Sequence, residues 1–125
     1  MILDTNALSA AAESQQAAAH ILSQATSIEL PVIVLGEYRF GIAESRHRLD
    51  YEKWLRELIG VTRVLPVENE TTVHYAQIRA ELKKAGRPIP SNDLWIAALC
   101  RHHRLPLMSQ DKHFDLVRDV NRIGW

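Results

Sequence analysis

Residues 1–6 read MILDTN, three apolar residues that run directly into an aspartate. Met1-Ile2-Leu3 is typical of the start of a buried strand, and we expect a short strand over residues 1–5. An acid at the end of such a strand either caps the next helix or belongs to a functional site. The fold that the rest of the chain predicts decides between these two roles for Asp4.

Short apolar segments alternate with helical patterns along the rest of the chain. Helices are indicated by apolar residues at helical spacing, such as Ala18, Ile21 and Leu22, and by Gly60 and Gly86 where C-terminal caps belong. Strands separated by helices predict right-handed crossovers, and therefore an α/β fold whose parallel sheet has helices on both faces. The expected helices are 13–25, 31–45, 50–60, 69–85 and 92–100, with a short helix or turn over 112–120, and the further expected strands are 27–31, 62–67, 105–109 and 122–125.

Length and composition limit the classes of protein. A chain of 125 residues has room for one core of ordinary size, so we expect a single domain over residues 1–125. Its 15 basic and 15 acidic residues give a formal charge of +0, so any phosphate-bearing partner must bind at a local site and not through the net charge of the chain.

The sequence also bears on the location of the protein. No apolar run approaches the ~18 residues of a membrane helix. There is no secretory signal pattern. The single Cys100 fits a reducing compartment. We expect a cytoplasmic protein that does not contact the membrane.

Most of the acidic residues have an ordinary structural explanation. Several, such as Asp50 and Glu57, lie near helix starts or on polar faces, as solvated acids usually do. Glu81 is expected to pair with Lys83 or Lys84 on the same helix. Four other acids are harder to explain in this way.

Asp4 and Asp111 each follow a predicted strand, Asp93 lies at the start of a helix that is apolar nearly all round, and Glu37 interrupts an apolar helical stretch. Ligands bind beyond the carboxyl ends of the strands in such sheets. Each acid also has an ordinary role open to it. These roles are a helix cap for Asp4, an ion pair with Arg39 for Glu37, a first-turn helix acid for Asp93 and a turn for Asp111.

The predicted fold brings these four carboxylates to one end of the sheet. Acids that share a cleft repel one another unless cations neutralise them. Mg²⁺ and Mn²⁺ prefer oxygen ligands, and such ions assist the attack of water in phosphoryl displacement. The four acids therefore predict metal-assisted hydrolysis of a phosphodiester. Asp115, four residues after Asp111, either joins the cluster or caps the next turn.

The stretches MILDTN, LGEYRFGI, IPSNDLWIAA and SQDKHF occur in this order along essentially the whole chain. Together they resemble the PIN domain, in particular the VapC-type toxins of bacterial toxin–antitoxin pairs. The resemblance implies a three-layer α/β/α fold with a short-stranded parallel central sheet. It also implies an Mg²⁺- or Mn²⁺-dependent endoribonuclease. Its catalytic and metal-binding acids would be Asp4, Glu37, Asp93 and Asp111.

The resemblance extends to residues around the acids. Asp115 matches a less regular additional acid, and Asn6 and Ser109 would orient the acids or a metal-bound water. Two positions depart from the family pattern, since Tyr38 follows Glu37 where an aliphatic residue is commoner, and Ser109 stands where threonine is usual. Neither departure removes a carboxylate, but the shape of the groove around Glu37 stays open.

The resemblance also implies partners. These are an RNA substrate, a second copy of the chain in a homodimer, and a cognate antitoxin whose tail lies in the active-site groove. An arginine or lysine of that tail could pair with the acids in place of metal or RNA. On this chain, Arg87, Lys112 and Arg39 are the candidates for RNA contact, although ordinary surface charge is the simpler explanation for each.

The histidines do not indicate a zinc site. His102 and His103 are adjacent, so they face different directions on a helix, and no Cys or His pair stands at zinc spacing. For His113, which lies close to Asp111, a solvated loop position is favoured over a contact with phosphate.

Three other functions compete with a nuclease. A haloacid-dehalogenase-type phosphatase needs a second acid two residues after the first, where this chain has Asn6. A receiver domain needs adjacent acids early in the chain, and only single acids occur. The serious alternative is a degenerate, non-catalytic PIN scaffold that binds protein or RNA. That alternative predicts an incomplete set of acids, whereas all four positions are filled.

Overall fold

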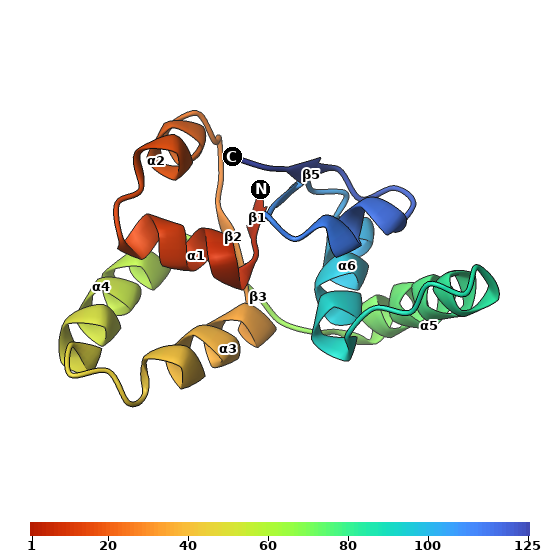
Figure 1. Cartoon of the computed structure of the whole chain (residues 1–125), viewed down its shortest axis with the longest axis horizontal. Helices are drawn as coiled ribbons and strands as arrows, with labels where there is room; N and C mark the ends of the chain where they lie inside the picture. Colours follow the sequence, from red (N-terminus) through yellow and green to blue (C-terminus); the bar gives the residue numbers. More distant parts are fainter.

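The computed structural model describes residues 1–125 and contains a five-stranded parallel sheet with helices on both faces (Figure 1). The predicted α/β class is confirmed. The strands are β1 (Ile2–Leu3), β2 (Glu29–Pro31), β3 (Arg63–Leu65), β4 (Leu107–Met108) and β5 (Arg122–Ile123). The helices are α1 (Thr5–Ala12), α2 (Gln16–Ser23), α3 (Val32–Ile42), α4 (Arg48–Gly60), α5 (Asn69–Lys84) and α6 (Ser91–His103), with a 3₁₀ helix, η1 (Lys112–Leu116).

The strand order, β3-β2-β1-β4-β5, changes direction at β1. The chain first runs outward from β1 to β3 through α1 to α4, and then returns through α5 and α6 to β4 on the other side of β1. Because parallel crossovers are right-handed, this reversal puts the two groups of helices on opposite faces. Figure 1 shows α1 to α4 on one side of the strands and α5 and α6 on the other. The carboxyl ends of β1 and β4 therefore border the crevice where such sheets bind ligands.

The first helical region differs from the prediction. The expected helix over residues 13–25 is present as α2, but a further helix that was not expected, α1, forms directly after β1. The helices are separated at Ser14, whose φ of 54° lies in the left-handed region that a continuous helix cannot contain. The sequence of α1, TNALSAAA, has Leu8 as its only large apolar residue, so it shows no apolar stripe from which a helix could be predicted.

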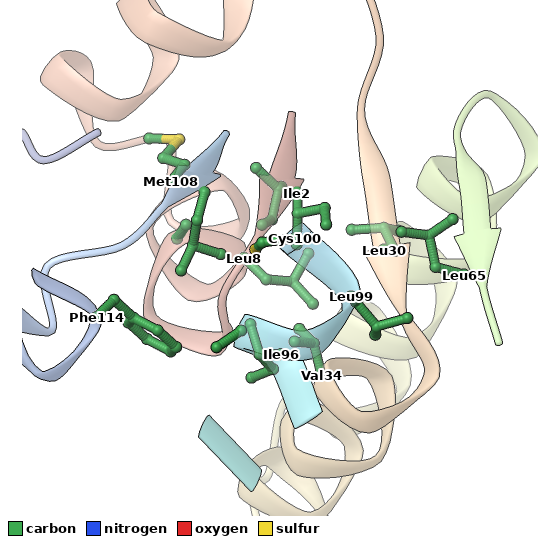
Figure 2. Close-up of a cluster of buried hydrophobic side chains, with 14 of the residues drawn as sticks. Ile2, Leu8, Leu30, Val34, Leu65, Ile96, Leu99, Cys100, Met108 and Phe114 are labelled. Atoms are coloured by element: carbon green, nitrogen blue, oxygen red, sulfur yellow. The ribbon is translucent and has the colours of Figure 1, made fainter. Parts of the chain in front are cut away.

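Helix α6 is the centre of the core, as its nearly continuous apolar sequence predicts. Its residues Ile96, Leu99 and Cys100 are fully buried beside strand residues such as Ile2 and Leu30 (Figure 2). Burial raises the pKa of the Cys100 thiol, so this residue packs as a neutral group. Since the helix is fixed along its length by this packing, residues at its first turn are held rigidly at the edge of the sheet. None of the helices is both long enough and apolar enough to span a membrane.

Candidate active site

Asp4 is the innermost acid of the candidate site. It follows β1 and is only 5% exposed. Its Oδ1 accepts a hydrogen bond from the N–H of Thr5 at 2.8 Å, so the carboxylate caps α1. Its Oδ2 accepts hydrogen bonds from the Ser109 hydroxyl at 2.7 Å and the Asn6 amide at 3.1 Å. Asp4 therefore has the structural role of a cap and also lies at the carboxyl end of a central strand.

Ser109 and Asn6 connect the ends of the two central strands. The Ser109 hydroxyl, which is fully buried, accepts a hydrogen bond from the N–H of Asp111 at 3.0 Å. The Asn6 side chain approaches Ser109 Oγ at 3.4 Å, and its Oδ1 accepts the N–H of Gln110 at 3.1 Å. These bonds fix Asp4 and the start of the Asp111 loop relative to each other. The contacts agree with the predicted orienting positions of Asn6 and Ser109, whose effect on activity stays a prediction.

Asp93 and Asp111 meet across the mouth of the crevice. One carboxylate oxygen of each residue and one ring nitrogen of His113 all lie within 4.8 Å of one another. His113 Nδ1 is 3.2 Å from Asp111 Oδ1 and 3.4 Å from Asp93 Oδ2. The side chain of His113 is half exposed, in keeping with a solvated loop position, but it also contacts both acids, which the sequence does not predict. The only sequence signal for this contact is its place two residues after Asp111.

Glu37 of α3 is the fourth acid, and it has no basic partner. Its Oε1 is buried and forms no hydrogen bond. The ion pair with Arg39 that the sequence left open does not form, because Arg39 Nε lies 3.5 Å from Glu52. A buried carboxylate oxygen without a partner is costly unless a ligand or cation satisfies it.

Three of the acids have a raised pKa. Burial is the main cause for Asp4, Glu37 and Asp93, and it raises the pKa of all three. The charge of Asp111 adds to the rise for Asp4 and Asp93, and the charges of Asp4 and Asp93 add to it for Glu37. Hydrogen bonds partly offset these effects, above all from Ser109 to Asp4 and between Asp93 and His113. The four carboxylates therefore form one electrostatically coupled group that a cation would stabilise.

The oxygen-rich donor set fits a hard divalent cation. Asp93 and Asp111 already converge, and the buried Glu37 oxygen lacks any partner. Carboxylate oxygens are the protein ligands that Mg²⁺ and Mn²⁺ prefer. None of the four acids forms a salt bridge with a lysine or arginine of the chain. The site is therefore suited to an added cation rather than to an internal one.

The remaining candidates lie outside this group. Asp115, a possible additional acid, pairs with Arg122 through two contacts of 2.8 Å, and this pairing lowers the pKa of Asp115. The structure therefore gives Asp115 a structural partner instead of a place beside the other acids. Arg87 and Lys112 are exposed and take part in no salt bridge, while Arg39 is engaged by Glu52. Contact of these three residues with RNA stays a prediction.

Tyr38 shapes the groove beside Glu37. Its ring is buried against Trp54, with ring centroids 6.2 Å apart. A groove of about 280 Å³ runs along α1 and α3 past Thr5, Glu37 and Tyr38. The phenol at this position thus packs inward as an aliphatic side chain would, and leaves space next to the Glu37 carboxylate.

We expect Glu37→Gln to stabilise the metal-free protein at pH 7 by roughly 0.5–2 kcal/mol, the range that single stabilising substitutions commonly give. The raised pKa means that the folded state binds a proton more readily than the unfolded state between the ordinary value of 4.5 and the raised value. Wild-type stability therefore falls as pH rises through that window, and the glutamine variant lacks this loss. Urea unfolding in chelator from pH 7 down to pH 4.5 measures the difference, which should shrink as the pH falls.

Glu57→Gln, on the exposed face of α4, is the matched control and should change stability little at any pH. A gain for Glu37→Gln that is the same at every pH would show that the effect is packing and not charge.

Comparison with known proteins identifies the family of the chain. The family model described as PIN domain matches residues 1–120. Ribonuclease VapC5 of Mycobacterium tuberculosis is 29% identical over 115 residues, which cover 90% of this chain and 84% of that protein.

Solved structures give the same fold. VapBC2 from Rickettsia felis, bound to a promoter DNA fragment, superimposes with a TM-score of 0.89 at 22% identity, covering 99% of this chain and 97% of that one. VapBC-1 from nontypeable Haemophilus influenzae superimposes with a TM-score of 0.85 at 26% identity, covering 99% and 96%. The first of these likenesses shows the fold alone.

Proposed function

Because this chain belongs to the PIN domain family, we propose that it is a metal-dependent endoribonuclease of the VapC type, the toxin of a toxin–antitoxin pair. One observation supports this above all others. Four carboxylates from four separate segments, Asp4, Glu37, Asp93 and Asp111, form one coupled group at the switch point of the sheet, with no lysine or arginine to neutralise them. The ribonuclease name of the M. tuberculosis relative points to RNA as the substrate. A single core of buried apolar residues supports treating residues 1–125 as one domain.

Asp93 and Asp111 would hold an Mg²⁺ or Mn²⁺ ion, with Asp4 and Glu37 completing the negative site. When bound, this ion makes a water molecule easier to deprotonate and stabilises the charge that develops on the phosphoryl oxygens. The ion fits the site because the residues present offer mainly carboxylate oxygens, one of which has no partner of its own.

Side chains around the acids have two tasks in this reaction. Some hold the Asp4 carboxylate in place, and another accepts a proton. Ser109, Asn6 and the N–H of Thr5 hold the Asp4 carboxylate in one orientation, since together they occupy both of its oxygens. A second carboxylate can accept the proton of the attacking water as a general base. Glu37 is free for this task, because its Oε1 has no hydrogen-bond partner and its raised pKa favours proton uptake.

We further propose a cognate antitoxin, a homodimer and a cytoplasmic location. The VapBC complex from H. influenzae, which superimposes over 99% of this chain, supports an antitoxin partner. An arginine or lysine of its tail would pair with the acids and so exclude both cation and RNA. The free Cys100 supports a reducing compartment.

The test is incubation of purified protein, freed of any bound partner, with an end-labelled RNA pool in Mg²⁺, in Mn²⁺ and in chelator. We expect discrete cleavage products with either metal and none in chelator. The alternative of a degenerate PIN scaffold predicts that RNA or protein is retained without being cut. Intact RNA in all three conditions, with no metal bound, would favour that alternative.

A further inference from the structure

A group of basic residues near the end of α5 has no acidic partner. Arg79, Lys83, Lys84 and Arg87 are all exposed, and none of them takes part in a salt bridge. The expected pairing of Glu81 with Lys83 or Lys84 is wrong. Both oxygens of Glu81 instead accept hydrogen bonds from Arg101 of α6, at 3.2 and 3.1 Å. A chain of formal charge +0 thus has a local region of uncompensated positive charge.

Two of these basic residues line a groove between α5, the loop 85–90 and the start of α6. The groove has a volume of about 470 Å³. Its lining contains no acidic residue and consists of Arg79, Lys83, Ser91 and Pro88 together with the apolar Leu82, Ile89 and Leu94. The three apolar residues are buried, so they form the floor, and the two exposed basic residues stand at its walls. This groove, the α5–α6 groove, is therefore complementary to a polyanion.

Arg79 is held in place before any ligand arrives. Its Nη1 donates a hydrogen bond to the Tyr75 hydroxyl at 2.9 Å, and its guanidinium lies 6.0 Å from the centre of the Tyr75 ring. Tyr75 in turn stacks on Trp95 of α6, with ring centroids 4.0 Å apart. Because the guanidinium is already ordered, binding an anion there costs less side-chain entropy.

The α5–α6 groove lies next to the acidic site. Leu94, in its floor, directly follows Asp93, and Ser91 precedes Asp93 by two residues, about 3 Å along the helix axis. The α5–α6 groove and the acidic site therefore share the first turn of α6, where Ser91 and Leu94 line the groove and Asp93 belongs to the acids.

We propose that the α5–α6 groove binds the phosphodiester backbone of single-stranded RNA that flanks the cleaved bond, with Arg79 and Lys83 contacting its phosphates. This inference rests on the proposed nuclease function. It assigns substrate positioning to a pair of residues outside the acidic site. Since phosphate contacts position a strand without reading its bases, the groove would bind RNA without preference for its sequence.

The test compares steady-state RNA cleavage, with Mn²⁺, by wild type and by the double variant Arg79→Ala/Lys83→Ala between 50 and 200 mM salt. Each phosphate contact of a single strand contributes ~0.7 to the slope of log affinity against log salt. We expect KM to rise roughly tenfold at low salt and its salt slope to fall by about 1.4, while kcat changes little.

Two further variants serve as controls. Lys53→Ala/Arg56→Ala removes the same charge from the exposed face of α4, which lies at the opposite end of the molecule from α5 (Figure 1), and should leave KM unchanged. Arg79→Lys/Lys83→Arg keeps both charges and should retain most of the salt slope. Circular dichroism checks that all variants are folded.

Equal salt slopes for the wild type and Arg79→Ala/Lys83→Ala would overturn the assignment of the α5–α6 groove and leave the nuclease function standing. A change in molecular mass by light scattering, without a change in slope, would also overturn it and identify the groove as a contact between copies of the chain. Absence of cleavage by the wild type on any RNA with metal would overturn both the proposed function and this inference.

Discussion

Asp4→Asn is expected to reduce RNA cleavage by at least about 10³-fold, the scale of loss seen when a group essential to catalysis is removed. Asp4 is the most buried of the four acids, and both of its oxygens have fixed partners. The substitution removes one negative charge from the coupled group, which weakens the hold on a divalent cation. Cleavage rates of labelled RNA with saturating Mn²⁺ measure the effect.

The same variant should fold normally. Asparagine caps helices about as well as aspartate, so its Oδ1 can still accept the N–H of Thr5. Its amide would face Ser109, whose hydroxyl can turn to accept instead of donate, and only the hydrogen bond from the Asn6 amide is lost. Asp50→Asn, in the exposed first turn of α4, is the control and should cleave like wild type. A folded Asp4→Asn protein that cleaves RNA at the wild-type rate would remove Asp4 from the mechanism.

Divalent cations are expected to stabilise the protein strongly. At a concentration of Mn²⁺ 100 times its dissociation constant, binding to the folded state alone stabilises by about 2.7 kcal/mol. For a chain of 125 residues this corresponds to a rise in Tm of roughly 10 °C. The gain arises because the cation relieves repulsion between acids that burial keeps from being solvated.

Thermal unfolding in Mn²⁺, compared with NaCl at the same ionic strength, measures this gain without relying on activity. The double variant Asp93→Asn/Asp111→Asn removes the two acids that converge, and it should show little stabilisation by Mn²⁺. Equal stabilisation of the wild type and the double variant would place the cation elsewhere on the protein.

The sequence predicts those acids of the site whose positions follow from the single strand or helix next to them. Asp4 directly follows β1 and Asp111 lies three residues after β4, and parallel strands end at one edge of a sheet. Asp93 lies in the first turn of a helix whose apolar sequence requires burial, so its position at that edge follows from the core. Glu37 stands out because an apolar stretch surrounds it.

The features that escaped prediction depend on contacts between distant segments. The pairing of Glu81 with Arg101 joins two helices and could not be distinguished from a pairing within α5 by spacing alone. Asp115 matched an acid of the site but is paired with Arg122, seven residues on, at the start of β5. His113 contacts Asp93 only because α6 and the loop after β4 meet at the same edge of the sheet.

The separation of α1 from α2 is a feature that local sequence does not predict. Ala-rich sequence favours helix throughout this region, and nothing in the residues around Ser14 requires a left-handed backbone there. The break leaves α1, which Asp4 caps, packed against both α2 and α3. Tertiary packing therefore overrides local propensity.

The most direct measurement of the central claim is the rate of RNA cleavage by partner-free wild-type protein as Mn²⁺ is titrated into a chelated sample. We expect no cleavage in chelator and a rate that saturates over the same Mn²⁺ range in which thermal stability rises, since one group of acids would be responsible for both. Cleavage that persists unchanged in excess chelator would contradict a carboxylate-held cation as the basis of the activity.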